Sequence, residues 1–217
     1  MKNAAMLVSL LLVAGCAGTA PKGDGWVDLM PSKDLKGWKR LPLDPALPLA
    51  SKEVYKVVDG LLVVDAVGGI KEVLINDEER GDGVFHVEWR WGRNQGEKPN
   101  YNGGIYLRSA VDGKTWIQAQ VARAQPKPPV VGDFIGMLMV DGKPTRIDKL
   151  QTGPSREAPV GDWNTTEITC KGSRISLSVN GGETLVWEDF PIARGHLGIQ
   201  AEFANYEIRA LKWKEGK

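Results

Sequence analysis

The chain has 217 residues, of which 42% are hydrophobic and 25% are charged, a composition that indicates one globular domain with a sizeable core. Its 28 basic residues nearly cancel its 27 acidic residues, so no broad basic field exists to attract nucleic acid or anionic lipid. A neutral small ligand is therefore the expected class of partner, and no nucleic acid is expected.

The first residues have the plan of a bacterial secretion signal. Lys2 precedes an apolar run over residues 4–14, which is too short to span a bilayer as a folded helix. The sequence VAGC, which ends at Cys16, resembles a lipobox, so Cys16 is predicted to be lipidated and to become the first mature residue. The alternative is an ordinary signal peptide that is cut near Gly18 or Ala20.

This interpretation fixes the expected domain boundaries and location. Residues 1–15 are the predicted lipoprotein signal peptide, residues 16–23 a linker, and residues 24–217 a single β-sandwich domain. Attachment to the membrane is expected through acyl chains only, on a lipoprotein of the bacterial cell envelope that faces the periplasm or lies at the cell surface. Cys170 is the only other cysteine, so the domain has no internal disulfide.

Short β-rich runs bounded by Gly, Asp, Asn and Pro follow along the rest of the chain, which is typical of an all-β sandwich or barrel. They cover residues 55–66, 83–92, 103–110, 115–122, 166–172, 174–181, 183–190 and 196–203. Hairpin turns are predicted at residues 58–60, 140–143, 171–174 and 179–182. Proline-containing segments 41–50 and 124–133 are expected as loops at an end or a rim of a sheet, and residues 76–83 as a solvated turn.

Alternation along these runs predicts which side chains face the core, because successive residues of a strand point to opposite faces. The residues expected inside are Phe85, Val87, Trp89, Trp91, Ile105, Leu107, Ile117, Ala119, Val121, Leu197, Ile199, Ala201 and Phe203. Most of Trp26, Trp38, Trp163, Trp187 and Trp213 are expected in the core as well.

The same alternation predicts that four strands share one polar face. Its members are His86, Glu88, Arg90, Tyr106, Arg108, Gln118, Gln120, His196, Gln200 and Glu202. Planar hydrogen-bonding groups together with an aromatic ring suit a hydroxyl-rich sugar. The alternative is that this face is merely the solvated side of an antiparallel sheet.

Motifs spread over the domain resemble those of the 3-keto-disaccharide hydrolase domain family, which has the concanavalin A-like lectin/glucanase fold. They run in family order from about Gly25 to Trp213: GWVDLMPSKDLKGWKR, VVDGLLVV, VFHVEWRWG, NGGIYLR, GDFIG, VGDWNTTEITCKGSRISLSVNG, GHLGIQ and YEIRALKW. The resemblance implies an all-β jelly-roll sandwich with one concave sheet. It also implies cleavage of 3-keto-glycosides by elimination followed by hydration.

That chemistry needs a base for the hydrogen on carbon 2 and donors for the enolate. Glu88 is the candidate base, with Glu202 or His86 as substitutes. The candidate substrate or enolate contacts are Arg90, Arg108, Gln118, Gln120 and Gln200, and Asn102 and Tyr106 are expected to orient the ring.

Two positions depart from the family pattern. Gln118 stands where the family usually has a glutamate, and Glu202 lies near the place of a missing histidine. Both a shifted substrate and a lost activity are consistent with these changes, so a non-catalytic carbohydrate-binding envelope lipoprotein is the alternative function. An envelope structural protein is a third possibility.

No cofactor is expected. His86 and His196 share outward parity and could bind a metal with Glu88 or Glu202, but no metal site is predicted because paired solvent-facing histidines are more often unliganded. If the chain cleaves keto sugars, a separate sugar oxidoreductase is a possible source of them.

Overall fold

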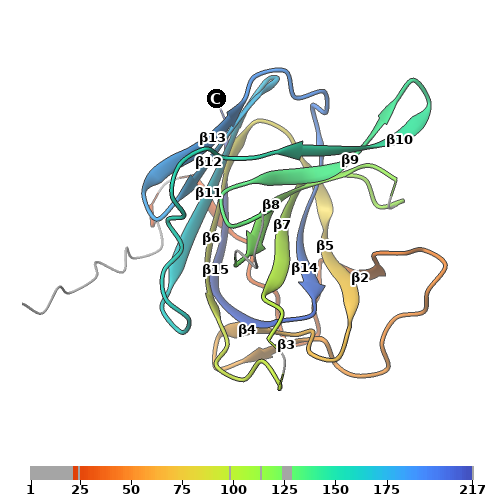
Figure 1. Ribbon diagram of the computed structural model, residues 1–217, viewed down its shortest axis with the longest axis vertical. Helices are drawn as coiled ribbons and strands as arrows, with labels where there is room; N and C mark the ends of the chain where they lie inside the picture. Colours follow the sequence, from red (N-terminus) through yellow and green to blue (C-terminus); the bar gives the residue numbers. More distant parts are fainter. Residues whose placement is uncertain (1–21, 24, 98, 113, 124–128, 217) are drawn as a thin grey trace, which may run out of the picture.

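The computed structural model describes residues 22–23, 25–97, 99–112, 114–123 and 129–216. Within these ranges the chain has no helix, and hence none that could cross a membrane. Two antiparallel sheets pack face to face (Figure 1). The predicted all-β jelly-roll sandwich is therefore confirmed, whereas the predicted signal peptide and Cys16 lie outside the described residues.

The strands divide between the two sheets as follows. The eight-stranded sheet has the order β13 (Gly182–Trp187), β12 (Arg174–Val179), β11 (Asn164–Lys171), β6 (Gly83–Trp91), β15 (Asn205–Glu215), β4 (Leu61–Asp65) and β3 (Tyr55–Val58), and β1 (Trp26–Asp28) also pairs with β15. The seven-stranded sheet has the order β10 (Lys143–Lys149), β9 (Phe134–Val140), β8 (Trp116–Ala122), β7 (Asn102–Ser109), β14 (Gly195–Glu202), β5 (Lys71–Arg80) and β2 (Trp38–Pro42).

The core lies between the sheets and is rich in tryptophan. Trp89 and Trp91 are each 1% exposed, as predicted, and their rings meet edge to face with 5.3 Å between centroids. Trp213 is also fully buried. Of the five other tryptophans assigned mostly to the core, Trp38 and Trp187 join Trp213 there, while Trp26 and Trp163 are only partly buried.

Tight turns connect the hairpins where the sequence predicted them. Asp141 and Gly142, between β9 and β10, both have positive φ, and so do Asn180 and Gly181 between β12 and β13. Two successive residues with positive φ match the right-handed twist of the flanking strands, which explains the Asp-Gly and Asn-Gly pairs.

Several segments differ from the prediction. Residues 76–80 continue β5 as a charged strand end that pairs with β14, so the solvated turn predicted there is wrong for these positions. Leu41 and Pro42 end the edge strand β2, where the missing N–H of proline is tolerated. Phe203 was predicted inside, but the backbone turns at its positive φ and Ala204 takes the buried place instead.

The residues of the predicted polar face are divided between the two sheets. β6 lies in the eight-stranded sheet, whereas β7, β8 and β14 are neighbours in the seven-stranded sheet. The inward sets of all four strands meet in the core, so their outward sets point away from each other on opposite sides of the sandwich. The prediction that all four strands share one face is therefore wrong.

Replacing Trp89 with alanine tests the described core. The indole fills the space between the sheets and its Nε1 donates to Thr166 Oγ1 at 3.0 Å, so Trp89→Ala is expected to lower the free energy of unfolding. The expected loss is about 3–5 kcal/mol, measured by denaturant unfolding. Val58→Ala, at a side chain that is 43% exposed, is the control. A Trp89→Ala loss no larger than that of Val58→Ala would contradict the packing.

Candidate functional site

A groove runs along the outer face of the seven-stranded sheet. Its larger part has a volume of about 620 Å³ and adjoins a second part of about 440 Å³. Both parts are lined by Trp116, Arg146, Gln200 and Glu202. The β9–β10 hairpin and the segment after β2 project from this sheet (Figure 1), and they contribute Arg146 and residues 43–45 to the lining. Volumes of this size are typical of small-ligand sites.

A row of side-chain amides crosses the smaller part of the groove. Gln118 Nε2 donates to Gln120 Oε1 at 2.6 Å, and Gln120 Nε2 donates to Asn102 Oδ1 at 2.7 Å. Asn102 in turn donates to the carboxylate of Glu202. The donors of the row therefore all run in one direction and end on a carboxylate.

Two amide oxygens of the groove lack a partner. Gln118 Oε1 and Gln200 Oε1 are both buried and accept no hydrogen bond within the protein. Gln118 and Gln200 are 1% and 3% exposed. A buried acceptor without a donor carries a desolvation cost. These two oxygens are positions where the hydroxyl group of a ligand would remove that cost.

Gly104 of β7 has no side chain, which leaves space for the amide row. A Cβ atom on Gly104 would lie 2.4 Å from Gln118 Cδ, far inside contact distance. Gly104 and Gln120 are register partners across β7 and β8, and Tyr106 is the partner of Gln118. A side chain on the second glycine of the NGGIYLR motif would thus displace the Gln118 amide from its place in the row.

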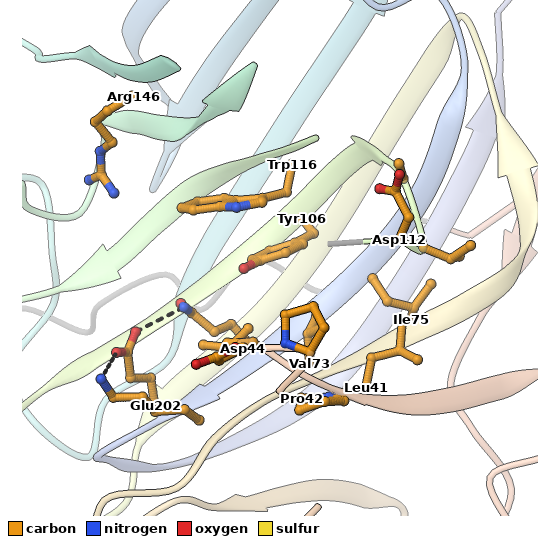
Figure 2. Close-up of a pocket in the computed structure, with 16 residues that line it drawn as sticks. Leu41, Pro42, Asp44, Val73, Ile75, Tyr106, Asp112, Trp116, Arg146 and Glu202 are labelled. Atoms are coloured by element: carbon orange, nitrogen blue, oxygen red, sulfur yellow. Dashed lines mark hydrogen bonds and ion pairs between the residues drawn. The ribbon is translucent and has the colours of Figure 1, made fainter. Parts of the chain in front are cut away.

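Glu202 is the carboxylate at the centre of the groove. Gln200 Nε2 donates to its Oε2 at 2.9 Å, and Lys71 Nζ lies 3.9 Å from its Oε1 (Figure 2). Burial raises the pKa of Glu202, although Lys71, the hydrogen bond from Asn102 and the charge of Arg146 act in the opposite direction. A carboxylate with a raised pKa in a groove has the property of a general base.

Two stacked aromatic rings line the groove between its two ends. Tyr106 and Trp116 lie parallel within 11° with 5.5 Å between centroids, and Arg146 lies over the indole at 5.8 Å. Burial, and then the nearby charge of Glu202, raise the pKa of the Tyr106 phenol. The phenol therefore stays protonated and can donate a hydrogen bond. Figure 2 shows its oxygen at the end of the ring that points toward Glu202.

Glu88, the first candidate base, lies on the opposite side of the molecule. It is 1% exposed on the outer face of the eight-stranded sheet, where it accepts from Arg209 and lies 3.2 Å from His86 Nε2. Arg90, on the same strand, pairs with Glu207. Glu88, His86 and Arg90 therefore cannot act with the amides of the groove, because the core separates the two outer faces.

Arg108 also takes a place other than the predicted one. Its φ is +42°, and the pairing of β7 with β14 shifts register beside it, between His196 and Gly198. The guanidinium is consequently buried at the end of the sandwich, where it donates to Gly81 O, Gly172 O and Ile192 O at 2.8–3.2 Å and to Asp82 at 2.8 Å. All its donors serve the fold, so its assignment to substrate is wrong.

The histidines do not form a site together. His196 lies on the seven-stranded sheet with Nδ1 2.9 Å from Asn76 O, while His86 lies on the eight-stranded sheet. Among the described residues, no group of three or more His, Cys, Asp or Glu side chains could hold a metal ion.

The structure thus brings together five of the predicted contacts, namely Asn102, Tyr106, Gln118, Gln120 and Gln200, with the substitute base Glu202. The sequence reasoning missed Trp116, which alternates with Gln118 and Gln120 and so carried the signal of the same face. It also missed Lys71 and Arg146, because β5 and β10 were not predicted as strands.

The sandwich fold, the groove and a family match together define a carbohydrate-active β-sandwich domain. Residues 25–214 match the family of 3-keto-alpha-glucoside-1,2-lyase-like domains, and the chain belongs to that family. The resemblance drawn from the sequence motifs is therefore confirmed. A search of the curated proteins found no match.

Solved structures share the fold at low sequence identity. A putative glycosyl hydrolase from Parabacteroides distasonis has a TM-score of 0.62 at 15% identity, covering 88% of this chain and 99% of that one. The kappa-carrageenase of Pseudoalteromonas carrageenovora has a TM-score of 0.60 at 11% identity, covering 90% and 97%. A carbohydrate-binding module from Bacillus subtilis has a TM-score of 0.57 at 13% identity, covering 81% and 94%. Enzymes and binding modules are thus both built on this fold.

Arg108→Met tests whether Arg108 supports the fold. Three carbonyl groups would lose their donor, so the variant is expected to lose about 3 kcal/mol of unfolding free energy, the upper end for buried groups left unpaired. Sugar affinity of the remaining folded protein should be unchanged in calorimetry. A variant of normal stability that has lost affinity for sugar would instead restore Arg108 to the binding site.

Proposed function

We propose that this chain cleaves 3-keto-glycosides by elimination at carbons 1 and 2 of the sugar, followed by addition of water. The observation that carries the proposal is Glu202, a carboxylate with a raised pKa that lies in a groove lined by aligned amides. Membership in a family of lyase-like domains supports the same reaction class.

The reaction requires no change of oxidation state. A ketone at carbon 3 acidifies the hydrogen on carbon 2, which Glu202 removes, and the electron pair is held as an enolate. When the carbonyl forms again, the bond from carbon 1 to the leaving oxygen breaks, a double bond remains between carbons 1 and 2, and the leaving group takes up a proton. Water then adds its oxygen to carbon 1 and a hydrogen to carbon 2, which yields the free keto sugar.

Neighbouring side chains have separate tasks in this scheme. The protonated phenol of Tyr106 and the guanidinium of Arg146 are donors for the enolate oxygen, whose charge develops only as the reaction proceeds. Gln118 and Gln200 accept from sugar hydroxyl groups through their unpartnered oxygens. Gln120 and Asn102 hold the amide row in place.

The ketone must be made before the sugar reaches this groove. Its formation removes two electrons and two protons, one proton from the hydroxyl group and one from carbon 3 itself, so the class of partner that precedes this chain is a sugar oxidoreductase. We also propose that both act in the bacterial envelope, which rests on the lipobox at Cys16.

Glu202→Gln separates the reaction from binding. The amide keeps the shape and the hydrogen bonds of the side chain but cannot take a proton, so turnover of a 3-keto-glucoside is expected to fall by about 10²- to 10⁴-fold while the affinity persists. Glu88→Gln, the same substitution at a glutamate on the opposite face, is the matched control and should keep full turnover. If wild-type protein binds keto-glucosides and releases no leaving group, the chain is a carbohydrate-binding protein instead.

Removing the charge of Lys71 tests the base through pH. Glu202 must be ionised to accept a proton, so turnover should rise with pH through its pKa, above the ordinary range of glutamate. Lys71 lowers that pKa, and Lys71→Met is therefore expected to move the acid limb of the pH–rate profile to higher pH. An acid limb that stays in place or moves to lower pH would contradict the assignment.

A further inference from the structure

The groove changes in character along its length. Register pairs between β14 and β5 follow one another as Glu202 with Lys71, Gln200 with Val73, and Gly198 with Ile75. The first and last pairs differ by four positions along each strand, which corresponds to about 13 Å. Over that distance the lining passes from an ion pair, through an amide beside an aliphatic side chain, to an aliphatic side chain alone.

The apolar end is a built compartment rather than a bare sheet surface. Val73 and Ile75 are 5% and 2% exposed, although they lie on the outer face of the sheet, and they form a separate hydrophobic cluster with Tyr106. Leu41 and Leu43 pack against this cluster from β2 and the segment after it. The outer face of an antiparallel sheet is normally polar, so an aliphatic cluster inside a groove indicates a ligand of matching chemistry.

Figure 2 shows the two ends on either side of the stacked rings. Glu202 and Arg146 lie toward one side of Tyr106 and Trp116, and Leu41 and Ile75 lie toward the other. The compartment therefore starts beside the reactive carboxylate and is continuous with it, since Gln200 and Val73 are directly opposite each other.

The acids that line the apolar end do not make it polar. Asp44 and Asp112 are exposed at the rim, and each caps its own turn. Asp44 Oδ1 accepts from Ala46 N at 3.0 Å, and Asp112 Oδ1 accepts from Lys114 N at 2.9 Å.

We propose that this compartment, formed by Leu41, Leu43, Val73, Ile75 and the Tyr106–Trp116 stack, holds an apolar leaving group of the glycoside. The substrates are then 3-keto-glycosides of alicyclic or aromatic alcohols rather than 3-keto-disaccharides. This inference rests on the proposed function, because the leaving group is bonded to carbon 1, next to the carbon whose hydrogen Glu202 removes.

The contrast between the two classes of leaving group follows from hydrogen bonding. A second sugar would bring several hydroxyl groups against aliphatic side chains that offer no partner, and each buried hydroxyl without a partner costs free energy. An apolar ring has no such cost and gains from removal of its surface from water. Contact with the Tyr106 ring favours an unsaturated or flat ring further.

The test compares two 3-keto-glucosides of the same anomeric form, one with cyclohexanol and one with glucose as the leaving group. Cyclohexanol is chosen over phenol because phenolate leaves easily whatever its contacts. Binding is measured by calorimetry in the Glu202→Gln background, so that substrate is not consumed, and turnover is measured in wild-type protein. Binding tests the compartment, and turnover tests the proposed function.

Val73→Thr is the informative variant, because it keeps the shape of the side chain and replaces one methyl group with a hydroxyl group. We expect it to weaken binding of the cyclohexyl compound by about tenfold, the usual effect of one changed contact in an apolar pocket, and to leave the disaccharide unaffected. Val58→Thr, the same substitution at an exposed position of β3, is the control. Leu41→Ala, at a partly buried side chain, gives the same comparison if Val73→Thr does not fold.

Each result has a defined meaning. The compartment is supported if the cyclohexyl compound binds more tightly than the disaccharide and Val73→Thr weakens that binding. This holds even if wild-type protein cleaves neither compound, a result that would refute the proposed reaction. Equal or tighter binding of the disaccharide, an unchanged preference in both variants, or no binding of either compound overturns it. Cleavage of both compounds at equal affinity supports the proposed reaction and refutes only the proposed compartment.

Discussion

A single buried guanidinium fixes two of the passages by which the chain crosses between the sheets. Gly81 lies where the chain passes from β5 to β6, Ile192 where it returns to β14, and Gly172 in the turn between β11 and β12. Arg108 of β7 donates to the carbonyl groups of all three. A charge in this position is tolerated because every one of these bonds replaces one lost to water. These two of the several passages between the sheets are thereby fixed relative to β7, whose outer face lines the groove.

The groove in turn depends on how closely its strands approach one another. On the core side, a Cβ atom on Gly103 would meet the ring of Tyr206 at 3.2 Å, and on the outer side one on Gly104 would collide with Gln118. β7 therefore carries no side chain on either face at this point, and Tyr206 and Gln118 fill the space. Glu202 gains its properties from the same crowding, because burial raises its pKa while the amide row and Lys71 keep hydrogen bonds and charge directed at it. The balance leaves a carboxylate that is held in place and still able to take a proton.

Alternation in the sequence predicts correctly which residues enter the core, and it does so because one buried face imposes a period of two on each strand. Trp89, Ile105, Ile117 and Ile199 are all inside as predicted. The period contains no information on which of two sheets a strand joins, since inward residues of both sheets meet in the same core. Glu88 was therefore grouped with Gln118 although the core lies between them.

Irregular backbone accounts for the other errors. Arg108 alternates correctly in the sequence, but a register shift and a positive φ carry it out of the pattern. Such a shift depends on the fit of two distant strands, and neither strand shows it alone. Trp116, by contrast, could have been predicted from its place two residues before Gln118. Arg146 and Lys71 could be placed only by recognising two strands that lack clear alternation, since β10 is mostly exposed and five successive residues of β5 are buried.

Because the donors of the amide row all run in one direction, its free side-chain oxygens bind the hydrogen of a hydroxyl group and not its oxygen. The side-chain amide nitrogens of Gln118, Gln120 and Gln200 each already donate within the protein, whereas the oxygens of Gln118 and Gln200 accept nothing. The unfilled acceptors among these amides, together with the carboxylate, are thus sites for hydrogen atoms, whereas Tyr106 and Arg146 supply donors to the same groove. Under the proposed function, sugar hydroxyl groups bind these acceptors through their hydrogens, and methylation of those hydroxyl oxygens would remove these particular hydrogen bonds.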